Sequence, residues 1–353
     1  MFLRNAWYAA GFTKDLNADS LQQTWVIGEP LVLFRRVDGT AVALEDRCCH
    51  RGAPLSRGRI EGDSVRCMYH GLRFEPGGRC IEVPGQRQVP DMLRVRSYPL
   101  CERDGWLWVW MGETSRADRA LVPTAMGLTD ERWTLGSGHM DYAANYELIN
   151  DNLCDFSHLS FVHINSFGGG QEADFRAFAE HKPEVELLPR GIRVSRWTLA
   201  QPAPLFLAGF EGRTLEIYLS YDYLAPGVLL MWSAMFPEGT AAACGHARPT
   251  AEPLHANFTS QAVTPLDARR TRYFFTWGPS TQENRPFLKD GMVALATQAF
   301  EEDRVMIEAQ QRIHDASPGL KMNPIVHDRG PNLMRKAMAR LIAEEGQKSA
   351  ELI

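Results

Sequence analysis

Cysteine and histidine occur together twice within one short stretch of the chain. The sequence reads Cys48-Cys49-His50-Arg51-Gly52 and then Cys67-Met68-Tyr69-His70-Gly71. Each loop supplies one thiolate and one imidazole, and its glycine lets backbone amides approach a bound sulfur. This symmetry matches a [2Fe-2S] centre with both sulfurs on one iron and both imidazoles on the other. We therefore predict that the centre is held by Cys48, His50, Cys67 and His70.

A zinc site made from the same four side chains is the alternative that the residues leave open. A zinc finger usually gives its two cysteines first and its two histidines on a following helix, and no helix is predicted here. Cys49 is interpreted as a bystander because the first loop is complete without it. The other four cysteines have no cysteine partner at ligand spacing and are predicted to be buried apolar residues, namely Cys80, Cys101, Cys154 and Cys244.

A second group of candidate ligands lies on a predicted helix from Asn145 to His163. Asp151, Asp155 and His158 have the spacing i, i+4, i+7, which places them on one helical face. For His158 and His163 to reach one metal, this helix must end or distort near Ser160. The alternative interpretation is an exposed pair of Asp155 and His158 on a solvated face.

A long helix predicted over residues 289–314 supplies a carboxylate. Its apolar stripe runs through Leu295, Ala299, Met306 and Ile313, and Asp303 lies within that stripe. A buried carboxylate without a partner is costly, so a metal ion or a cation is expected beside it. His158, His163 and Asp303 together make a 2-His-1-carboxylate set that leaves positions open on Fe(II). An ion pair of Asp303 with Arg304 or Arg312 on a solvated face is the alternative.

The elements that must position these groups fall into two parts. Residues 1–115 are predicted to be all-β, with short strands separated by glycine and proline turns, and residues 116–130 form a polar linker. Residues 116–353 are predicted to be an α+β domain, in which an antiparallel sheet (193–236 and 257–278) packs against helices that include a tail helix over 332–346. Two domains, 1–115 and 116–353, are therefore expected.

Composition limits the classes of protein. The 353 residues carry 38 Lys and Arg against 43 Asp and Glu, a net charge of -5, which argues against nucleic-acid binding. No apolar run is long enough to span a membrane, and the opening residues lack the apolar core of a signal peptide, so a cytoplasmic protein is expected. Seven cysteines, an odd number at irregular spacing, favour metal ligation over a disulfide framework.

Both constellations resemble those of the Rieske non-haem iron aromatic oxygenases, in the terminal oxygenase subunit. The resemblance rests on the two cysteine and histidine loops, on Arg51-Gly52-Ala53-Pro54-Leu55 after the first, on D-N-L-C-D-F-S-H-x4-H from Asp151, and on F-E-E-D-R from Phe300. Within the family the chain looks most like vanillate O-demethylases, dicamba-type O-demethylases and toluenesulfonate methyl monooxygenases. That resemblance implies a helix-grip, START-like fold for the second domain.

The resemblance also implies cofactors and partners. It implies a Rieske [2Fe-2S] cluster, a mononuclear Fe(II), and a homotrimer in which Asp155 bridges His70 of one subunit to His158 of the next. Electrons would come from NADH through a separate reductase with flavin and a ferredoxin-type cluster, because this chain has no dinucleotide-binding fingerprint. Dioxygen and a small aromatic molecule would be the substrates. An electron carrier without catalysis is the competing class of function.

The reaction that the resemblance implies is insertion of one oxygen atom into a methyl or methoxy C–H bond, with formaldehyde released from a methoxy group. N-dealkylation and ring hydroxylation are the alternatives within the family. Asn152 and His255 are candidates for contacting a ligand or the substrate. Four residues are expected as apolar walls of the substrate pocket, namely Phe206, Trp232, Met235 and Phe258. The sequence offers no definite arginine clamp for an anionic substrate.

Overall fold

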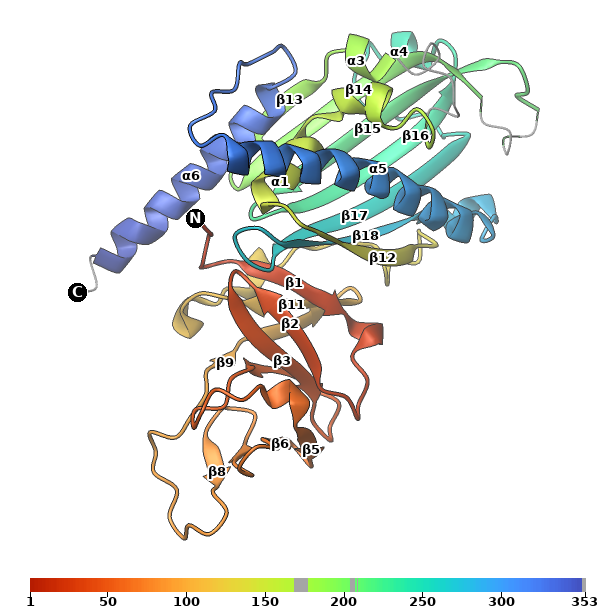
Figure 1. Ribbon diagram of the computed structural model, residues 1–353. Coiled ribbons are helices and arrows are strands. Elements are labelled where there is room, and N and C mark those ends of the chain that lie inside the picture. The colour runs from red at the N-terminus through yellow and green to blue at the C-terminus, as the bar shows by residue number, and fades with distance from the viewer. Residues whose placement is uncertain (168–176, 204–206, 208, 351–353) are drawn as a thin grey trace. The chain divides into compact units, whose positions relative to one another are not determined.

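The computed structural model describes residues 1–167, 177–203, 207 and 209–350. The chain separates into two compact units. The first is Met1–Thr124 together with Thr264–Thr271, and the second is Ala125–Val263 together with Arg272–Ile353. Figure 1 shows both units with their elements labelled.

The first unit is all-β and holds three small antiparallel sheets. One has the order β1 (Trp7–Phe12), β11 (Trp106–Trp110), β10 (Leu100–Arg103). The second has the order β2 (Gln22–Val26), β3 (Glu29–Arg35), β4 (Ala41–Glu45), β9 (Ser97–Tyr98). The third has the order β5 (Arg59–Glu61), β6 (Ser64–Arg66), β7 (Arg73–Phe74), β8 (Cys80–Glu82). The prediction of an all-β N-terminal part is confirmed.

Each of the two cysteine and histidine loops follows a strand of this unit. The first follows β4, and the second joins β6 to β7. Their cysteines, Cys48 and Cys67, lie in one apolar cluster with neighbours such as Phe74. The same strands that build the core therefore hold both sulfur atoms.

The second unit is built on a seven-stranded sheet. Its order is β12 (Gly136–Tyr142), β18 (Thr271–Pro279), β17 (His255–Pro265), β16 (Val228–Pro237), β15 (Thr214–Leu224), β14 (Gly191–Pro202), β13 (Glu184–Leu188). The strands from β13 to β17 pair antiparallel in sequence. The predicted α+β class is confirmed, and β12 and β13 extend the sheet beyond the strands that the sequence indicated.

Helices cover one face of this sheet, with α5 lying across it (Figure 1). The helices of the second unit are α1 (Tyr146–Cys154), α2 (Leu159–Val162), α3 (Ala177–Glu180), α4 (Thr240–Ala243), α5 (Leu288–Ala316) and α6 (Arg329–Ala350). Short 3-10 turns are η1 (Thr13–Asp15), η2 (Leu55–Arg57), η3 (Thr114–Arg116), η4 (Arg119–Leu121), η5 (Phe156–His158) and η7 (Thr281–Glu283). No helix in these described ranges is long and apolar enough to cross a membrane.

The predicted single helix from 145 to 163 is wrong. Asn145 caps α1 by accepting a hydrogen bond from the backbone N–H of Glu147, and α1 ends at Cys154. Asp155 then takes an extended conformation, and its side chain caps the next turn through the N–H of Ser157. The break lies at Asp155 rather than near Ser160, because an aspartate that caps a new turn competes with continuation of the old helix.

The buried stripe of α5 also differs from the predicted one. The side chains that the structure buries include Phe300, Asp303 and Ile307, whereas Met306 and Ile313 are exposed. The two stripes share Ala299 and Asp303 and separate after Asp303, because successive steps of three or four residues both fit a helical period of 3.6. Asp303 is buried in either case.

Candidate metal centres

The two loops of the first unit have the same internal geometry. In each, the N–H of the loop glycine donates to the carbonyl of the loop cysteine, from Gly52 to Cys48 at 2.9 Å and from Gly71 to Cys67 at 3.0 Å. Both glycines have positive φ, +71° and +78°, which side chains with a Cβ adopt only with strain. The tight loops thus need glycine at these positions.

The four predicted ligands differ in exposure. Cys48 and Cys67 are buried, whereas His50 and His70 are exposed, and the two imidazole rings lie 4.5 Å apart between centroids. Burial raises the pKa of the Cys48 thiol to about 12, so this sulfur becomes a thiolate only when a metal replaces its proton. A [2Fe-2S] group fits this donor set, with sulfurs inside and imidazoles at the surface.

Gly71 gives a test of the loop geometry. A Cβ at this position would meet Cγ of Pro84 at 2.7 Å, and the proline ring cannot rotate away. Gly71→Ala is therefore expected to destabilise the domain by about 2 to 4 kcal/mol, from left-handed strain and the clash together. Thermal unfolding followed by the visible absorbance of the cluster measures this loss.

Gly85 provides the matched control. It has a similar φ of +79°, but a Cβ there meets no atom within 4 Å. Gly85→Ala should cost about 1 to 2 kcal/mol, the strain alone. Equal melting temperatures for the two variants would contradict the close approach of the second loop to Pro84.

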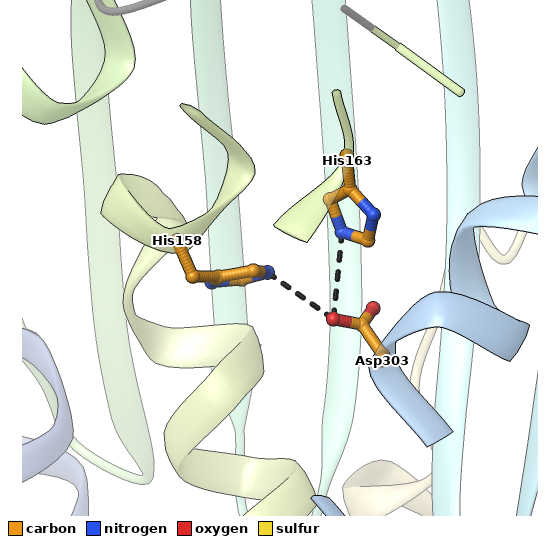
Figure 2. Close-up of side chains that lie close together, drawn as sticks. All are labelled: His158, His163 and Asp303. Atoms are coloured by element: carbon orange, nitrogen blue, oxygen red, sulfur yellow. Dashed lines mark ion pairs between the residues drawn. The ribbon is translucent and has the colours of Figure 1, made fainter. Parts of the chain in front are cut away.

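The break at Asp155 brings the second group of candidate ligands together. Nε2 of His158 lies 3.5 Å from Oδ1 of Asp303, and Nε2 of His163 lies 3.4 Å from the same oxygen (Figure 2). One ligand atom from each of these residues lies within 4.8 Å of the other two. Three side chains from α5 and from the segment after α1 thus converge on one point.

The other nitrogen of each imidazole is held by a fixed acceptor. Nδ1 of His158 lies 2.6 Å from the carbonyl oxygen of Asp155, and Nδ1 of His163 lies 3.0 Å from Oε2 of Glu302. When Nδ1 donates its proton to these oxygens, both Nε2 lone pairs face the carboxylate of Asp303. A divalent iron bound by two imidazoles and one carboxylate fits this arrangement.

The charges around the two imidazoles are unequal. Burial lowers the pKa of His158, and the nearby charge of Asp303 offsets only part of this effect. Burial also disfavours charge on His163, but the hydrogen bonds and charges of Asp303 and Glu302 exceed it and raise the pKa of His163. His158 is therefore the easier of the two imidazoles to keep in the neutral form that binds a metal.

Two domain families match the chain where these centres lie. The Rieske [2Fe-2S] domain matches residues 6–99, and the vanillate O-demethylase oxygenase C-terminal domain matches residues 142–344. The chain belongs to the Rieske non-haem iron oxygenases. It is an oxygenase component of the demethylase and methyl-monooxygenase type, with a [2Fe-2S] cluster and a mononuclear iron as cofactors.

Relatives of this oxygenase align over 88% to 99% of its length. It is 36% identical to the iron-sulfur subunit of the toluene-4-sulfonate monooxygenase system of Comamonas testosteroni, over 99% of this chain and 100% of the relative. It is 31% identical to the oxygenase component of dicamba O-demethylase from Stenotrophomonas maltophilia, over 88% of each chain. The crystal structure of dicamba monooxygenase bound to 3,6-dichlorosalicylic acid superposes with a TM-score of 0.86 at 27% identity, covering 98% of this chain and 99% of that one.

The candidate bridge residue of the oxygenase, Asp155, makes two kinds of contact. Its carboxylate accepts hydrogen bonds from the N–H and the hydroxyl of Ser157, at 2.8 and 2.9 Å. Its backbone carbonyl, rather than its carboxylate, faces Nδ1 of His158. The expected link between Asp155 and His158 is thus made by the main chain.

Asn152 lies at the iron site of the oxygenase. Its Nδ2 donates to Oδ1 of Asp303 at 3.0 Å and lies 3.3 Å from Nε2 of His158. Glu302 and Ser166 also support the site, although the sequence analysis did not select them. Glu302 faces His163 and accepts a hydrogen bond from the hydroxyl of Ser166 at 2.7 Å. The only sequence signal for Glu302 was its place beside Asp303.

Asn152→Ala is expected to weaken iron binding at this site by about tenfold or more, because changes beside metal ligands commonly cost 10- to 100-fold. Asn150, on the same helix, is the control, since it bonds instead to Tyr223 and Pro226. Asn150→Ala should lower the melting temperature without changing the affinity for iron. Iron titration of the two folded, iron-stripped variants measures the difference in iron affinity. Equal iron affinities of the two variants would show that Asn152 does not contribute to the iron site.

His255 lies away from the iron ligands of the oxygenase. It is buried, and its Nδ1 faces Oε2 of Glu283 at 2.7 Å. The residues around the metal triad enclose a cavity of about 90 Å³, and His255 is not among those that line it. Its predicted role in contacting substrate therefore receives no support from the described part of the cavity.

Two of the four predicted apolar walls, Trp232 and Phe258, lie on the opposite face of the sheet from the cavity. Met231, rather than Trp232, lines the cavity, and Trp232 packs on the opposite face against Tyr218. Phe258 stacks on Trp133, Met235 lies further along β16 beside His255, and Phe206 is outside the described residues. Aromatic side chains do line the cavity, namely Phe156, Phe167, Trp277 and Phe300.

Proposed function

We propose that the chain hydroxylates a methyl or methoxy carbon of a small aromatic substrate, using dioxygen and electrons that a separate NADH-dependent reductase delivers. The observation that carries this proposal is the convergence of His158, His163 and Asp303 beside an apolar, aromatic-lined cavity. Residues 1–115 would act as the Rieske domain and residues 116–353 as the catalytic domain. Cys48, His50, Cys67 and His70 would bind the cluster.

The metal groups would supply stepwise electron delivery and dioxygen activation. The chain's own residues orient the two imidazoles and form the cavity for the substrate. His158 and His163 keep their Nδ1 protons on fixed oxygens, which holds both rings in one orientation. The aromatic side chains Phe156, Trp277 and Phe300 exclude water and leave space for the substrate beside the triad.

We further propose a homotrimer in which electrons pass between subunits near Asp155. Two observations support this arrangement. The imidazoles of His50 and His70 are exposed, so the cluster edge is open to a partner. The carboxylate of Asp155 accepts a hydrogen bond from the hydroxyl of Ser157, and Nδ1 of His158 faces the backbone carbonyl of Asp155 instead. The carboxylate of Asp155 is therefore available to contact another subunit.

N-dealkylation is a second candidate, because one relative is named for action on an N-alkyl group. The chain is 31% identical, over 98% of its length, to the oxygenase component of chloroacetanilide N-alkylformylase from Rhizorhabdus wittichii. O-demethylation, N-dealkylation and methyl hydroxylation all begin with oxygen insertion into a C–H bond. The products, and not the site geometry, separate them.

The test uses iron-loaded protein, a reductase, NADH and a panel of methoxylated, N-alkylated and methyl-substituted aromatics. Oxygen uptake and formaldehyde release are measured together. One formaldehyde per oxygen consumed with a methoxy or N-methyl substrate supports demethylation, and an equal amount of a benzylic alcohol supports methyl hydroxylation. No oxygen uptake with any member would instead favour an electron carrier.

A further inference from the structure

The imidazole of His163 lies between the carboxylates of two consecutive residues of α5. Its Nε2 lies 3.4 Å from Oδ1 of Asp303, and its Nδ1 lies 3.0 Å from Oε2 of Glu302. The side chain of His163 is only 2% exposed, and that of Glu302 is 20% exposed. Asp303 and Nε2 both face the point where the metal ligands converge. Glu302 therefore lies on the side of the ring away from the metal.

The imidazole of His158 has a different partner. Its Nδ1 lies 2.6 Å from the backbone carbonyl oxygen of Asp155, which is a neutral acceptor. A carboxylate is a stronger acceptor than a carbonyl, and a carboxylate at Nδ1 makes the opposite ring nitrogen more basic. The two imidazoles are therefore unequal ligands, and His163 is the stronger electron donor of the pair.

A turn after His163 holds Glu302 in place. The N–H of Ser166 donates to the carbonyl oxygen of His163 at 3.2 Å, and the hydroxyl of Ser166 donates to Oε2 of Glu302 at 2.7 Å. The oxygen that faces Nδ1 of His163 thus accepts a second hydrogen bond from a buried side chain. Two donors on one oxygen fix the carboxylate against the edge of the ring.

The charge of the metal gives Glu302 a further effect. Two neutral imidazoles and the carboxylate of Asp303 supply one negative charge to an ion that carries two positive charges. Glu302 adds a second negative charge at a distance of one imidazole ring. Because His163 and Asp303 are buried, solvent weakens this interaction less than it would at the surface. Negative charge near an iron centre also favours its oxidised form, which has one more positive charge.

We propose that Glu302 is a positioning residue that orients His163 through Nδ1, strengthens the binding of the mononuclear iron and lowers its reduction potential. This inference rests on the proposed function, which assigns His158, His163 and Asp303 as the iron ligands. Glu302 acts through His163 and does not itself bind the metal.

Glu302→Gln tests the effect of the charge, because glutamine keeps the length of the side chain and an oxygen acceptor for Nδ1. Protein with an intact cluster and no mononuclear iron is titrated with Fe(II) under anaerobic conditions. The affinity is taken at the pH where it no longer rises, so that protons do not compete with the metal. We expect the affinity to fall about tenfold or more. The potential of the mononuclear iron, from a redox titration monitored by electron paramagnetic resonance, should rise.

Two control variants separate the charge at this position from general effects. Glu301→Gln removes the same charge from the neighbouring residue, whose side chain is 45% exposed and pairs with Arg304. It should keep both the affinity and the potential, because exposed charges are screened. Ser166→Ala removes one hydrogen bond to Glu302 and keeps the charge, so the potential should stay close to the wild-type value.

The outcomes distinguish this inference from the proposed function. Lower affinity and a higher potential in Glu302→Gln, with both values kept in Glu301→Gln, support the role of Glu302. Unchanged affinity in Glu302→Gln would overturn it, and so would a loss of affinity with an unchanged potential, since the effect would then be structural. Failure of the wild type to bind Fe(II) beyond its cluster would instead overturn the metal triad, and with it the inference.

Discussion

Replacing His158 by alanine is expected to abolish turnover while the visible spectrum of the cluster persists. His158 supplies one of three ligand atoms that lie within 4.8 Å of each other, and the other two cannot hold iron at comparable affinity. The cluster ligands belong to the other compact unit, so their geometry is untouched. We expect product formation to fall by more than about 100-fold, beyond the loss that changes next to ligands produce.

The measurement is product formation by variant and wild type at equal cluster absorbance. The matched control is His139→Ala, which removes an exposed histidine on β12 of the same unit. It should retain turnover. Substantial activity in His158→Ala would show that oxygen chemistry occurs without the proposed triad.

Asp155→Asn is expected to keep both metal centres and to lose about 100-fold in turnover. Asparagine caps a turn as well as aspartate, so the hydrogen bond from the N–H of Ser157 should persist. The contact of His158 with residue 155 uses the backbone carbonyl, which the substitution does not change. The main change is therefore loss of the carboxylate charge, which we propose lies on the path between subunits.

Iron content and single-turnover kinetics check this prediction. With a cluster reduced in advance, the rate of electron transfer to the mononuclear iron should fall, while the iron content stays at the wild-type value. Ser157→Ala is the control, because it removes one hydrogen bond to the same carboxylate and keeps the charge. It should cost tenfold or less. Wild-type turnover in Asp155→Asn would exclude the carboxylate from electron transfer.

The cluster loops could be read from the sequence because their ligands are close along the chain. Cys48 with His50, and Cys67 with His70, each lie in one tight loop whose geometry is set by local hydrogen bonds. The metal triad needed more, since His158 and Asp303 are distant in sequence and meet only in the folded domain. Asp303 was found because a carboxylate on a buried helical stripe needs a partner.

The cavity walls could not be read in the same way. Both faces of β16 carry large apolar side chains, so alternation does not tell whether Met231 or Trp232 faces the helices. The helix break at Asp155 was misplaced because the spacing of Asp151, Asp155 and His158 also fits a continuous helix. Tertiary contacts decided both cases, and these depend on residues far away in the chain.

The iron content of the purified wild-type chain, measured together with its visible spectrum, tests the central claim most directly. We expect about three iron atoms per chain, two in a red-brown Rieske cluster and one held by His158, His163 and Asp303. About two iron atoms per chain with a complete cluster spectrum, after loading with excess Fe(II), would contradict the assignment of a mononuclear iron centre.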